Sequence, residues 1–190
     1  MEKMKEKYKK EVVPQIMKEE DLKSPMAAPG IEKVVVSTGF GKMVAGKASD
    51  EQKKISSSIA KEIALITGQH PVLNEAKKAI SGFKLRKGMP VGASAVLRGE
   101  KMYDFLERVV NIVLPRSRDF SGIPLKSFDK EGNLTIPVKD HLVFPEIAPE
   151  DSKVSFGLEI TVVTTAKNRE EGVKLLTLMG FPLKKEQQEK

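Results

Sequence analysis

Apolar residues recur every fourth position near the start of the chain, with Lys and Glu between them. Met4, Tyr8, Val12 and Ile16 form this series. Side chains spaced by three or four residues share one face of a helix. The pattern therefore predicts an amphipathic helix over residues 2–20.

Helical spacing also predicts three later helices, over residues 48–66, 100–114 and 169–179. We expect Ser49 or Asp50 to cap the first of these three, and Gly180 to cap the last. Proline lacks a backbone N–H and disrupts a helix interior. We therefore expect Pro14 to interrupt the N-terminal helix and Pro115 to stop the helix that begins at residue 100.

Short runs rich in β-branched residues predict strands between the helices, over residues 31–37, 71–74, 91–98, 134–138 and 158–165. Several of them look half-buried, which is typical of antiparallel sheets with one covered face. We predict an α+β fold: a mostly antiparallel β-sheet with helices packed on one face, an N-terminal helix and a long loop. One domain is expected over residues 1–183, with a charged tail over 184–190.

Composition narrows the function. The 190 residues include 33 Lys and Arg against 26 Asp and Glu, which gives a net charge of +7. This excess of positive charge favours an anionic partner, with nucleic acid ahead of a membrane surface. There is no Cys, which excludes disulfides and thiolate metal sites. No apolar run approaches the roughly 20 residues of a membrane span, and the charged N-terminus does not resemble a secretory signal, so we expect a cytoplasmic protein.

One segment resembles a phosphate-binding loop. Gly41–Lys47 reads GKMVAGK, follows a predicted strand and precedes a predicted helix. A nucleotide hydrolase needs Ser or Thr next, to bind Mg²⁺, but Ala48 stands there and Ser49 comes one residue late. This alternative function is therefore disfavoured.

Other enzymatic constellations are also weak. His70 and His141 are each isolated in sequence, so we expect no metal site and interpret them as surface or buried structural histidines. Glu100, Asp104 and Glu107 are spaced for surface ion pairs on a helix. We predict a protein that is not an enzyme and that uses no cofactor.

The most informative segment is a stretch from Ala76 to Gly99 that contains no acidic residue. Its cations are Lys77, Lys78, Lys84, Arg86, Lys87 and Arg98. Ser81 adds a hydrogen-bond donor, and Phe83 is placed to stack or wedge. A second basic cluster consists of Arg116, Arg118 and Lys126. These patterns predict recognition of a folded RNA through its phosphates, with affinity that falls steeply with salt. A free-standing RNA chaperone is an alternative within the same class.

Long motifs make the chain resemble the large-subunit ribosomal protein five family, which docks 5S ribosomal RNA in the central protuberance. The resemblance covers about residues 5–183. The matching stretches are IEKVVVSTGFG (31–41), ALITGQHPV (64–72), AKKAISGFKLRKGMPVG (76–92), LRGEKMYDFLERVVNIVLPRSRDFSGI (97–123), KSFDKEGNLTIPVKDHLVFPEI (126–147) and LEITVVTTAKN (158–168).

This resemblance implies a ribosome-bound structural protein. The implied partners are 5S rRNA, 23S rRNA, the P-site tRNA, a protein of the small-subunit head and neighbouring proteins of the central protuberance. The implied 5S positions are Lys33, Ser37, Thr38, Gly39, Gln69, Val96 and Arg98. A mobile basic loop over residues 76–90 is expected to reach the tRNA. Further rRNA contacts are expected at Lys101, Arg116, Arg118 and Lys126.

Two implied 5S positions depart from the family pattern. The family usually has Asn where this chain has Ser37, and Thr where it has Val96. Loss of a hydroxyl at Val96 is worth about 0.5–1.5 kcal/mol if that group bonds RNA. Met is also common in the family where Thr38 stands, and Gly where Pro137 stands.

Overall fold

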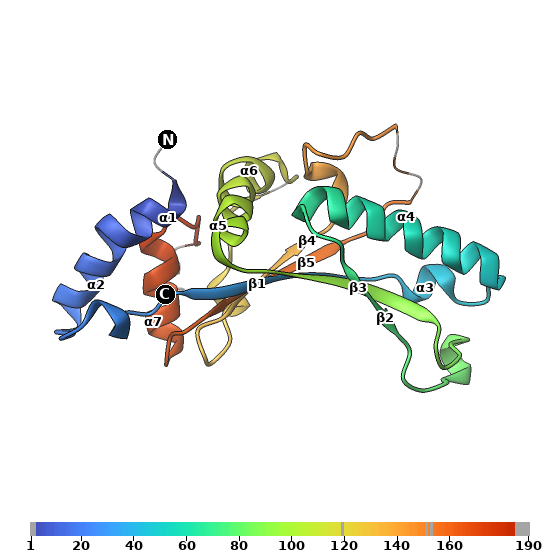
Figure 1. Cartoon of the computed structure of the whole chain (residues 1–190), viewed down its shortest axis with the longest axis horizontal. Helices are drawn as coiled ribbons and strands as arrows, with labels where there is room; N and C mark the ends of the chain where they lie inside the picture. Colours follow the sequence, from blue (N-terminus) through green and yellow to red (C-terminus); the bar gives the residue numbers. More distant parts are fainter. Residues whose placement is uncertain (1–2, 119, 151, 153, 185–190) are drawn as a thin grey trace, which may run out of the picture. The chain divides into compact units, whose positions relative to one another are not determined.

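The structure is a computed structural model that describes residues 3–118, 120–150, 152 and 154–184 (Figure 1). The strands are β1 (Ile31–Gly39), β2 (Val72–Glu75), β3 (Pro90–Leu97), β4 (Leu134–Val138) and β5 (Leu158–Thr164). The α-helices are α1 (Met4–Lys7), α2 (Val13–Glu19), α3 (Gly41–Val44), α4 (Ser49–Thr67), α5 (Gly99–Arg108), α6 (Leu114–Arg116) and α7 (Arg169–Leu178). Two π-helical turns are η1 (Tyr8–Val12) and η4 (Val109–Val113), and the 3₁₀ turns are η2 (Pro25–Ala27), η3 (Ser81–Phe83), η5 (Leu125–Ser127) and η6 (His141–Val143).

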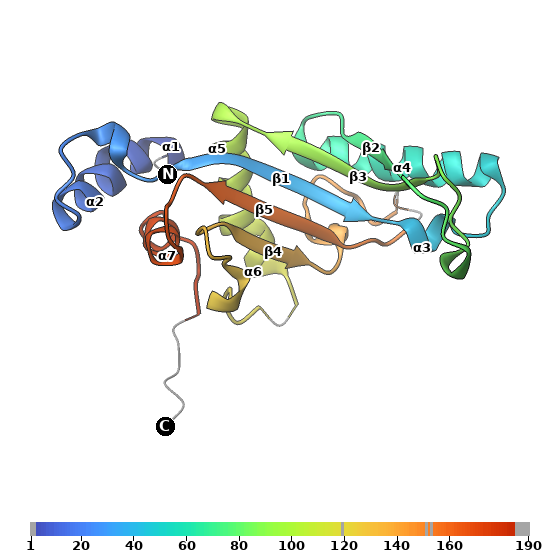
Figure 2. The same ribbon diagram turned by 90° about the horizontal axis from the view of Figure 1, so that it is seen from below.

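The strands form one sheet in the order β2-β3-β1-β5-β4. Strands β2 and β3 are antiparallel, with Val72 opposite Ser94 and Asn74 opposite Gly92. In Figure 2 the arrows of β1, β3 and β5 show that neighbouring strands run in opposite directions. The predicted α+β class, with an antiparallel sheet and packed helices, is confirmed.

The described chain divides into two compact units. Unit 1 combines residues 1–34, 98–136 and 161–190, and unit 2 combines residues 35–97 and 137–160. The single domain expected over residues 1–183 stays a prediction. Of the expected tail, residues 185–190 lie outside the described part of the chain. Among the described residues, no helix is both long and apolar enough to span a bilayer.

Two prolines act differently from the expectation. The helix that contains Pro14 continues to Glu19, and the one that contains Pro115 continues to Arg116 instead of stopping. A π-helical turn ends two residues before each proline, η1 before Pro14 and η4 before Pro115. A proline ring clashes with the carbonyl four residues earlier, and the wider turn removes that clash without ending the helix.

The expected caps are only partly correct. Ser49 and Asp50 both lie inside α4, and the residue at its N-cap is Ala48, whose side chain makes no capping bond. The side chain of Gln52 instead donates a hydrogen bond to the Lys47 carbonyl at 2.7 Å. Gly180 follows the last helix with φ +94°, as expected for a residue just past a helix end.

In unit 1, a tight turn before β4 packs against helix α7. The Asp129 carboxylate accepts hydrogen bonds from the backbone N–H groups of Glu131 and Asn133, at 2.9 and 2.8 Å. Burial alone raises the pKa of Asp129, but a hydrogen bond from the Asn133 side chain at 2.8 Å, together with these backbone hydrogen bonds, outweighs it and lowers the pKa overall. The turn places Gly132, with φ +81°, directly against Gly172 of α7.

Salt bridges join the N-terminal helix to the rest of unit 1. Lys5 Nζ lies 2.6 Å from Glu100 Oε1, and Lys174 Nζ lies 2.8 Å from Glu19 Oε2. Hydrogen bonds from the lysines lower the pKa of Glu100 and of Glu19. Because these carboxylates are exposed, we assign the pairs an orienting role and not a large share of stability.

Candidate RNA interface

One face of the sheet in unit 2 is covered by helix α4, and the other is open (Figure 1). Along β3 the residues Ala93, Ala95 and Leu97 are buried on the covered face. The alternate residues, Ser94 and Val96, are only half-buried. Successive side chains of a strand point to opposite faces, so this alternation defines the open face.

The open face is lined by small and polar side chains. In unit 2 it carries Val35, Ser37, Val72, Asn74, Ser94 and Val96. Asn74 Nδ2 donates a hydrogen bond to Ser94 Oγ at 3.3 Å, across the β2–β3 pair. Small side chains let a ligand approach the strand backbone closely, and hydroxyl and amide groups can bond phosphate or a ribose hydroxyl.

Gln69 connects the end of α4 with this sheet. It follows Gly68, where the helix ends in the left-handed conformation, and its side chain is exposed. Gln69 Nε2 donates a hydrogen bond to the Val96 carbonyl at 3.2 Å. Two implied 5S positions that are distant in sequence, Gln69 and Val96, are therefore in direct contact.

Thr38 and Gly39 differ in their availability. Thr38 is buried on the covered side, and its Oγ1 donates to the Gly157 carbonyl at 2.6 Å. We leave its side chain out of the proposed interface, because this internal hydrogen bond already satisfies it. Gly39 is exposed, and a Cβ built on it would meet nothing within 4 Å.

The basic stretch forms an extension of the β2–β3 hairpin. Ala76 N donates to Met89 O at 2.8 Å, and Gly88 N donates to Ala76 O at 3.0 Å. Farther out, Ile80 and Leu85 form an antiparallel bridge that closes the tip. Backbone hydrogen bonds thus hold the two arms of the expected loop together. Its expected mobility stays a prediction.

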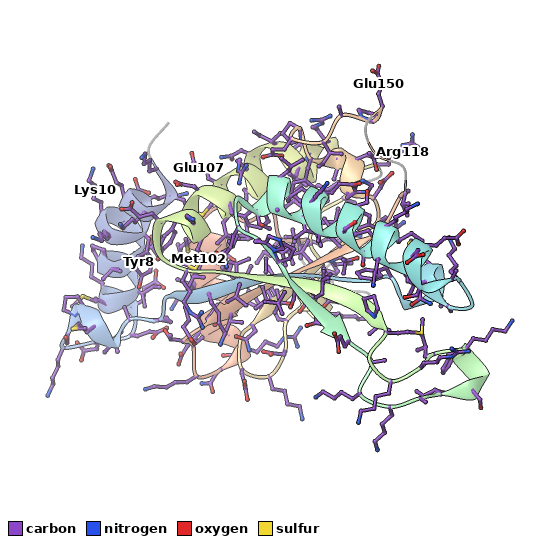
Figure 3. All side chains as sticks on the ribbon, turned by 45° about the vertical axis from the view of Figure 1, so that its right-hand side comes forward. Tyr8, Lys10, Met102, Glu107, Arg118 and Glu150 are labelled. Atoms are coloured by element: carbon purple, nitrogen blue, oxygen red, sulfur yellow. The ribbon has the colours of Figure 1, made fainter. Side chains whose placement is uncertain are left out.

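The cations of this hairpin extension project into solvent. Lys77, Lys78, Lys84, Arg86 and Lys87 are all exposed, as is Ser81. Phe83 is 67% exposed at the tip, where its ring is accessible to a partner. Within the described chain, none of the five cations has a salt bridge to a carboxylate. Nitrogen-tipped side chains extend outward from this hairpin in Figure 3.

The remaining basic positions belong to unit 1. Lys33 is half-buried in β1, with its Nζ 3.5 Å from Glu32 Oε1. The others are all exposed: Arg98, Lys101, Arg116, Arg118 and Lys126. Arg98 immediately precedes α5, and Lys101 lies within its first turn.

The glycine segment cannot act as a phosphate-binding loop in this conformation. Such a loop holds phosphates with free backbone N–H groups. Here Gly41–Val44 is the short helix α3. The N–H groups of Met43, Val44, Ala45 and Lys47 all donate to carbonyls of residues 40–44. The nucleotide hydrolase is therefore disfavoured on two grounds: Ala48 stands where Ser or Thr is needed, and the backbone N–H groups are already bonded within the segment.

Each of the two histidines has contacts within the protein that are typical of a surface or a buried structural histidine. His70 is exposed and its Nδ1 lies 2.9 Å from the Pro71 carbonyl. His141 is fully buried, with Nε2 2.8 Å from both Glu62 Oε2 and Ser152 Oγ. The structure also stacks His141 on Phe156, with ring centroids 4.0 Å apart. In the described residues no cluster of three potential metal ligands occurs.

Replacing His141 with Ala should destabilise unit 2 by about 1–3 kcal/mol, because Glu62 would then be buried without its main partner. Urea unfolding followed by circular dichroism would measure this loss. His70→Ala is the control and should unfold within about 0.5 kcal/mol of the parent. Equal stability of the two variants would show that the buried network contributes little.

Sequence reasoning misses parts of this interface. The sequence pattern assigns Asn74 only to a strand, and it does not single out Val35. Alternation along each strand marks the open face, but the β2–β3 register that places Asn74 beside Ser94 is a property of the folded hairpin. No local signal in the sequence specifies that register.

Comparison with known proteins shows which family the chain resembles in sequence. Residues 24–86 match the family described as Ribosomal protein L5, and residues 90–183 match the family that describes the C-terminus of the same ribosomal protein. The large ribosomal subunit protein uL5 of Geotalea daltonii is 48% identical over 184 residues, covering 97% of this chain and 99% of that protein. The uL5 protein of Dictyoglomus thermophilum is also 48% identical, over 97% of this chain and 100% of its own length.

These relatives place the chain among the ribosomal proteins, which are structural components and not enzymes. The matches span nearly its whole length. The chain belongs to the ribosomal L5 family.

Proposed function

We propose that this chain binds 5S rRNA and attaches it to 23S rRNA in the central protuberance, while its basic hairpin contacts the P-site tRNA. The chain itself is a structural constituent of the large ribosomal subunit, and it is ribosome-bound in the cytoplasm. What we propose is how it holds its RNA partners. No bond is made or broken in this role.

The observation that carries the proposal is the set of exposed hairpin cations without carboxylate partners in the described chain. Lysine and arginine that are not neutralised internally are free to pair with phosphates. Each pairing releases a counterion from the RNA, which favours binding at low salt. The scarcity of aromatic residues, 5% of the chain, favours a folded RNA over a splayed single strand.

We assign 5S contacts to the open face of unit 2, at Ser37, Gly39, Gln69 and Val96. Ser37 supplies a hydroxyl, and Gly39 permits close approach of RNA to the strand backbone. The exposed Gln69 is already oriented by its hydrogen bond to Val96. Lys33 and Arg98, which belong to unit 1, are proposed as separate, positively charged 5S contacts of that unit.

Other exposed basic residues of unit 1 are proposed to contact a different RNA from the open face of unit 2. Lys101, Arg116, Arg118 and Lys126 are exposed, so each can reach a phosphate without rearrangement of the core. We assign them to contacts with 23S rRNA. A bridge to a protein of the small-subunit head and contacts with neighbouring proteins of the central protuberance complete the proposed partners.

The test is binding of the full chain to a 5S rRNA transcript at several salt concentrations, with tRNA as a competitor. We expect tight binding at low salt, a steep fall in affinity as salt rises, and partial competition by tRNA through the hairpin. Indifference to the 5S transcript even in dilute buffer would overturn the proposal.

The double variant Ser37→Asn with Val96→Thr should bind 5S rRNA about two- to tenfold more tightly, because it adds polar groups on the open face worth about 0.5–1.5 kcal/mol. A filter-binding titration measures the change. Thr135→Asn with Val163→Thr is a control of matched chemistry outside unit 2 and should leave 5S affinity unchanged. Equal or weaker binding by the first variant would show that Ser37 and Val96 do not limit the contact.

A further inference from the structure

A cleft of about 980 Å³ lies within unit 2, between two segments that are distant in sequence. One wall is the turn from Gly46 to Ser49 with the start of α4, including Gln52 and Lys53. The other wall is the hairpin extension, from Ala79 to Pro90. The size is in the upper part of the range of small-molecule sites, roughly 300–1,000 Å³.

The lining of this cleft is strongly basic. It includes five cations and no carboxylate: Lys47, Lys53, Lys84, Arg86 and Lys87. Within the part of the chain that the structure describes, none of the five forms a salt bridge. Asp50 and Glu51 occupy the first turn of α4, but neither lines the cleft. These five positive charges repel one another, because no carboxylate lies among them to neutralise them. Binding of an anion in the cleft would reduce this repulsion.

The two walls approach each other closely at Lys84 and Gly46. Lys84 has φ +51°, a left-handed conformation that is uncommon for a residue with a side chain. From this position its stem reaches the opposite wall: a Cβ built on Gly46 would lie 3.7 Å from Lys84 Cδ. Uncommon backbone conformations concentrate at binding sites. Here the conformation directs a cation across the cleft.

We propose that this cleft is a phosphate-binding site in which Lys47 and Lys53 face the same anion as the hairpin cations. Its ligand is a run of closely spaced phosphates, supplied either by an RNA backbone or by a free polyphosphate chain. Cations on both walls neutralise such a ligand from two sides, which an exposed hairpin alone cannot do. For the RNA source, this inference rests on the proposed function and adds a second wall to the hairpin's contact.

The test compares two charge-reversed variants of the full chain. Lys47→Glu with Lys53→Glu reverses the cleft wall. Lys54→Glu with Lys61→Glu makes the same change in net charge at exposed positions of α4 that do not line the cleft. Thermal unfolding of both variants checks that each is folded. The probes are a tRNA transcript, a 5S rRNA transcript and inorganic tripolyphosphate, each titrated at several salt concentrations.

We expect the cleft variant to bind tRNA or 5S rRNA at least tenfold more weakly than the control variant. The slope of log affinity against log salt should also fall by about 1.4–1.8 units, since two phosphate contacts are lost and each removes roughly 0.7–0.9. Loss of tripolyphosphate binding alone, with RNA binding equal to that of the control, would assign the site to a free polyphosphate.

Two outcomes separate this inference from the proposed function. Suppose that the cleft variant and its control bind all three probes equally well, while hairpin variants lose affinity for RNA. The proposed role of Lys47 and Lys53 is then wrong, and the proposed RNA-binding function stands. If the parent chain ignores both RNAs but binds tripolyphosphate through Lys47 and Lys53, the cleft is correct and the proposed RNA contacts are wrong.

Discussion

The triple variant Lys84→Glu, Arg86→Glu and Lys87→Glu is expected to bind a tRNA transcript at least 100-fold more weakly than the parent chain at low salt. Three cations of the hairpin extension become three anions, so attraction for phosphate turns into repulsion. The slope of log affinity against log salt should fall by about two to three units, because each lost phosphate contact removes roughly 0.7–0.9. Filter binding across a salt series measures both quantities.

The matched control is Lys54→Glu, Lys61→Glu and Lys139→Glu. These residues are exposed in unit 2, lie neither in the hairpin extension nor among the residues that line the cleft, and give the same change in net charge. The control should lose affinity only modestly, through the long-range field of the protein. If both triple variants weaken tRNA binding equally, the hairpin has no special role and net charge alone governs affinity. Binding to 5S rRNA should decrease less in the hairpin variant, since the open face is unchanged.

Gly172→Ala should destabilise the chain by about 3 kcal/mol, although alanine is intrinsically favoured over glycine in a helix by roughly 1 kcal/mol. A Cβ at this position of α7 would overlap the backbone of Gly132, at its carbonyl oxygen and at its Cα. Backbone cannot swing aside as a flexible side chain can. Because the turn is fixed by Asp129 and by the hydrogen bond from Thr164 Oγ1 to Gly132 O, the clash must separate α7 from it.

Thermal unfolding measures this effect, and the midpoint should fall by about 6–12 °C, given roughly 2–4 °C per kcal/mol for a chain of this size. Gly82→Ala is the control, because a Cβ there would meet nothing within 4 Å and φ is not positive. That variant should be neutral or slightly stabilised. A Gly172→Ala variant as stable as the parent would show that α7 can shift freely against the turn.

The fourfold spacing in the N-terminal helix illustrates how far a sequence pattern reaches. In a regular α-helix each fourth residue advances by about 40° beyond a full turn, so three steps drift by about 120°. The turn η1 accommodates one additional residue, which is worth about 100° and nearly cancels that drift. Met4, Val12 and Ile16 are accordingly all buried. The spacing predicts the buried face correctly, but local propensity does not reveal the wider turn that makes it possible.

The candidate site was only partly predictable, for a physical reason. The cations of the hairpin extension could be identified because they are contiguous and lack acidic neighbours in sequence. Thr38 could not be separated from Ser37, because its burial depends on the Gly157 carbonyl, far along the chain. Lys53 carried no local signal either, and Lys47 stood out only as the lysine of the disfavoured phosphate-loop pattern. Their relation to Lys84 exists only after the turn before α4 and the hairpin fold toward each other.

The order of strands in the sheet also constrains how the polypeptide matures during its own synthesis. Strand β5 lies between β1 and β4, yet it is the last of the five to be made. Until residues 158–164 emerge, β1 and β4 each present an open edge, and such edges invite pairing with other chains. A nascent or truncated product that stops before this segment is therefore exposed to aggregation. Completion of the sheet, and with it of both units, therefore waits until residues 158–164 have been made.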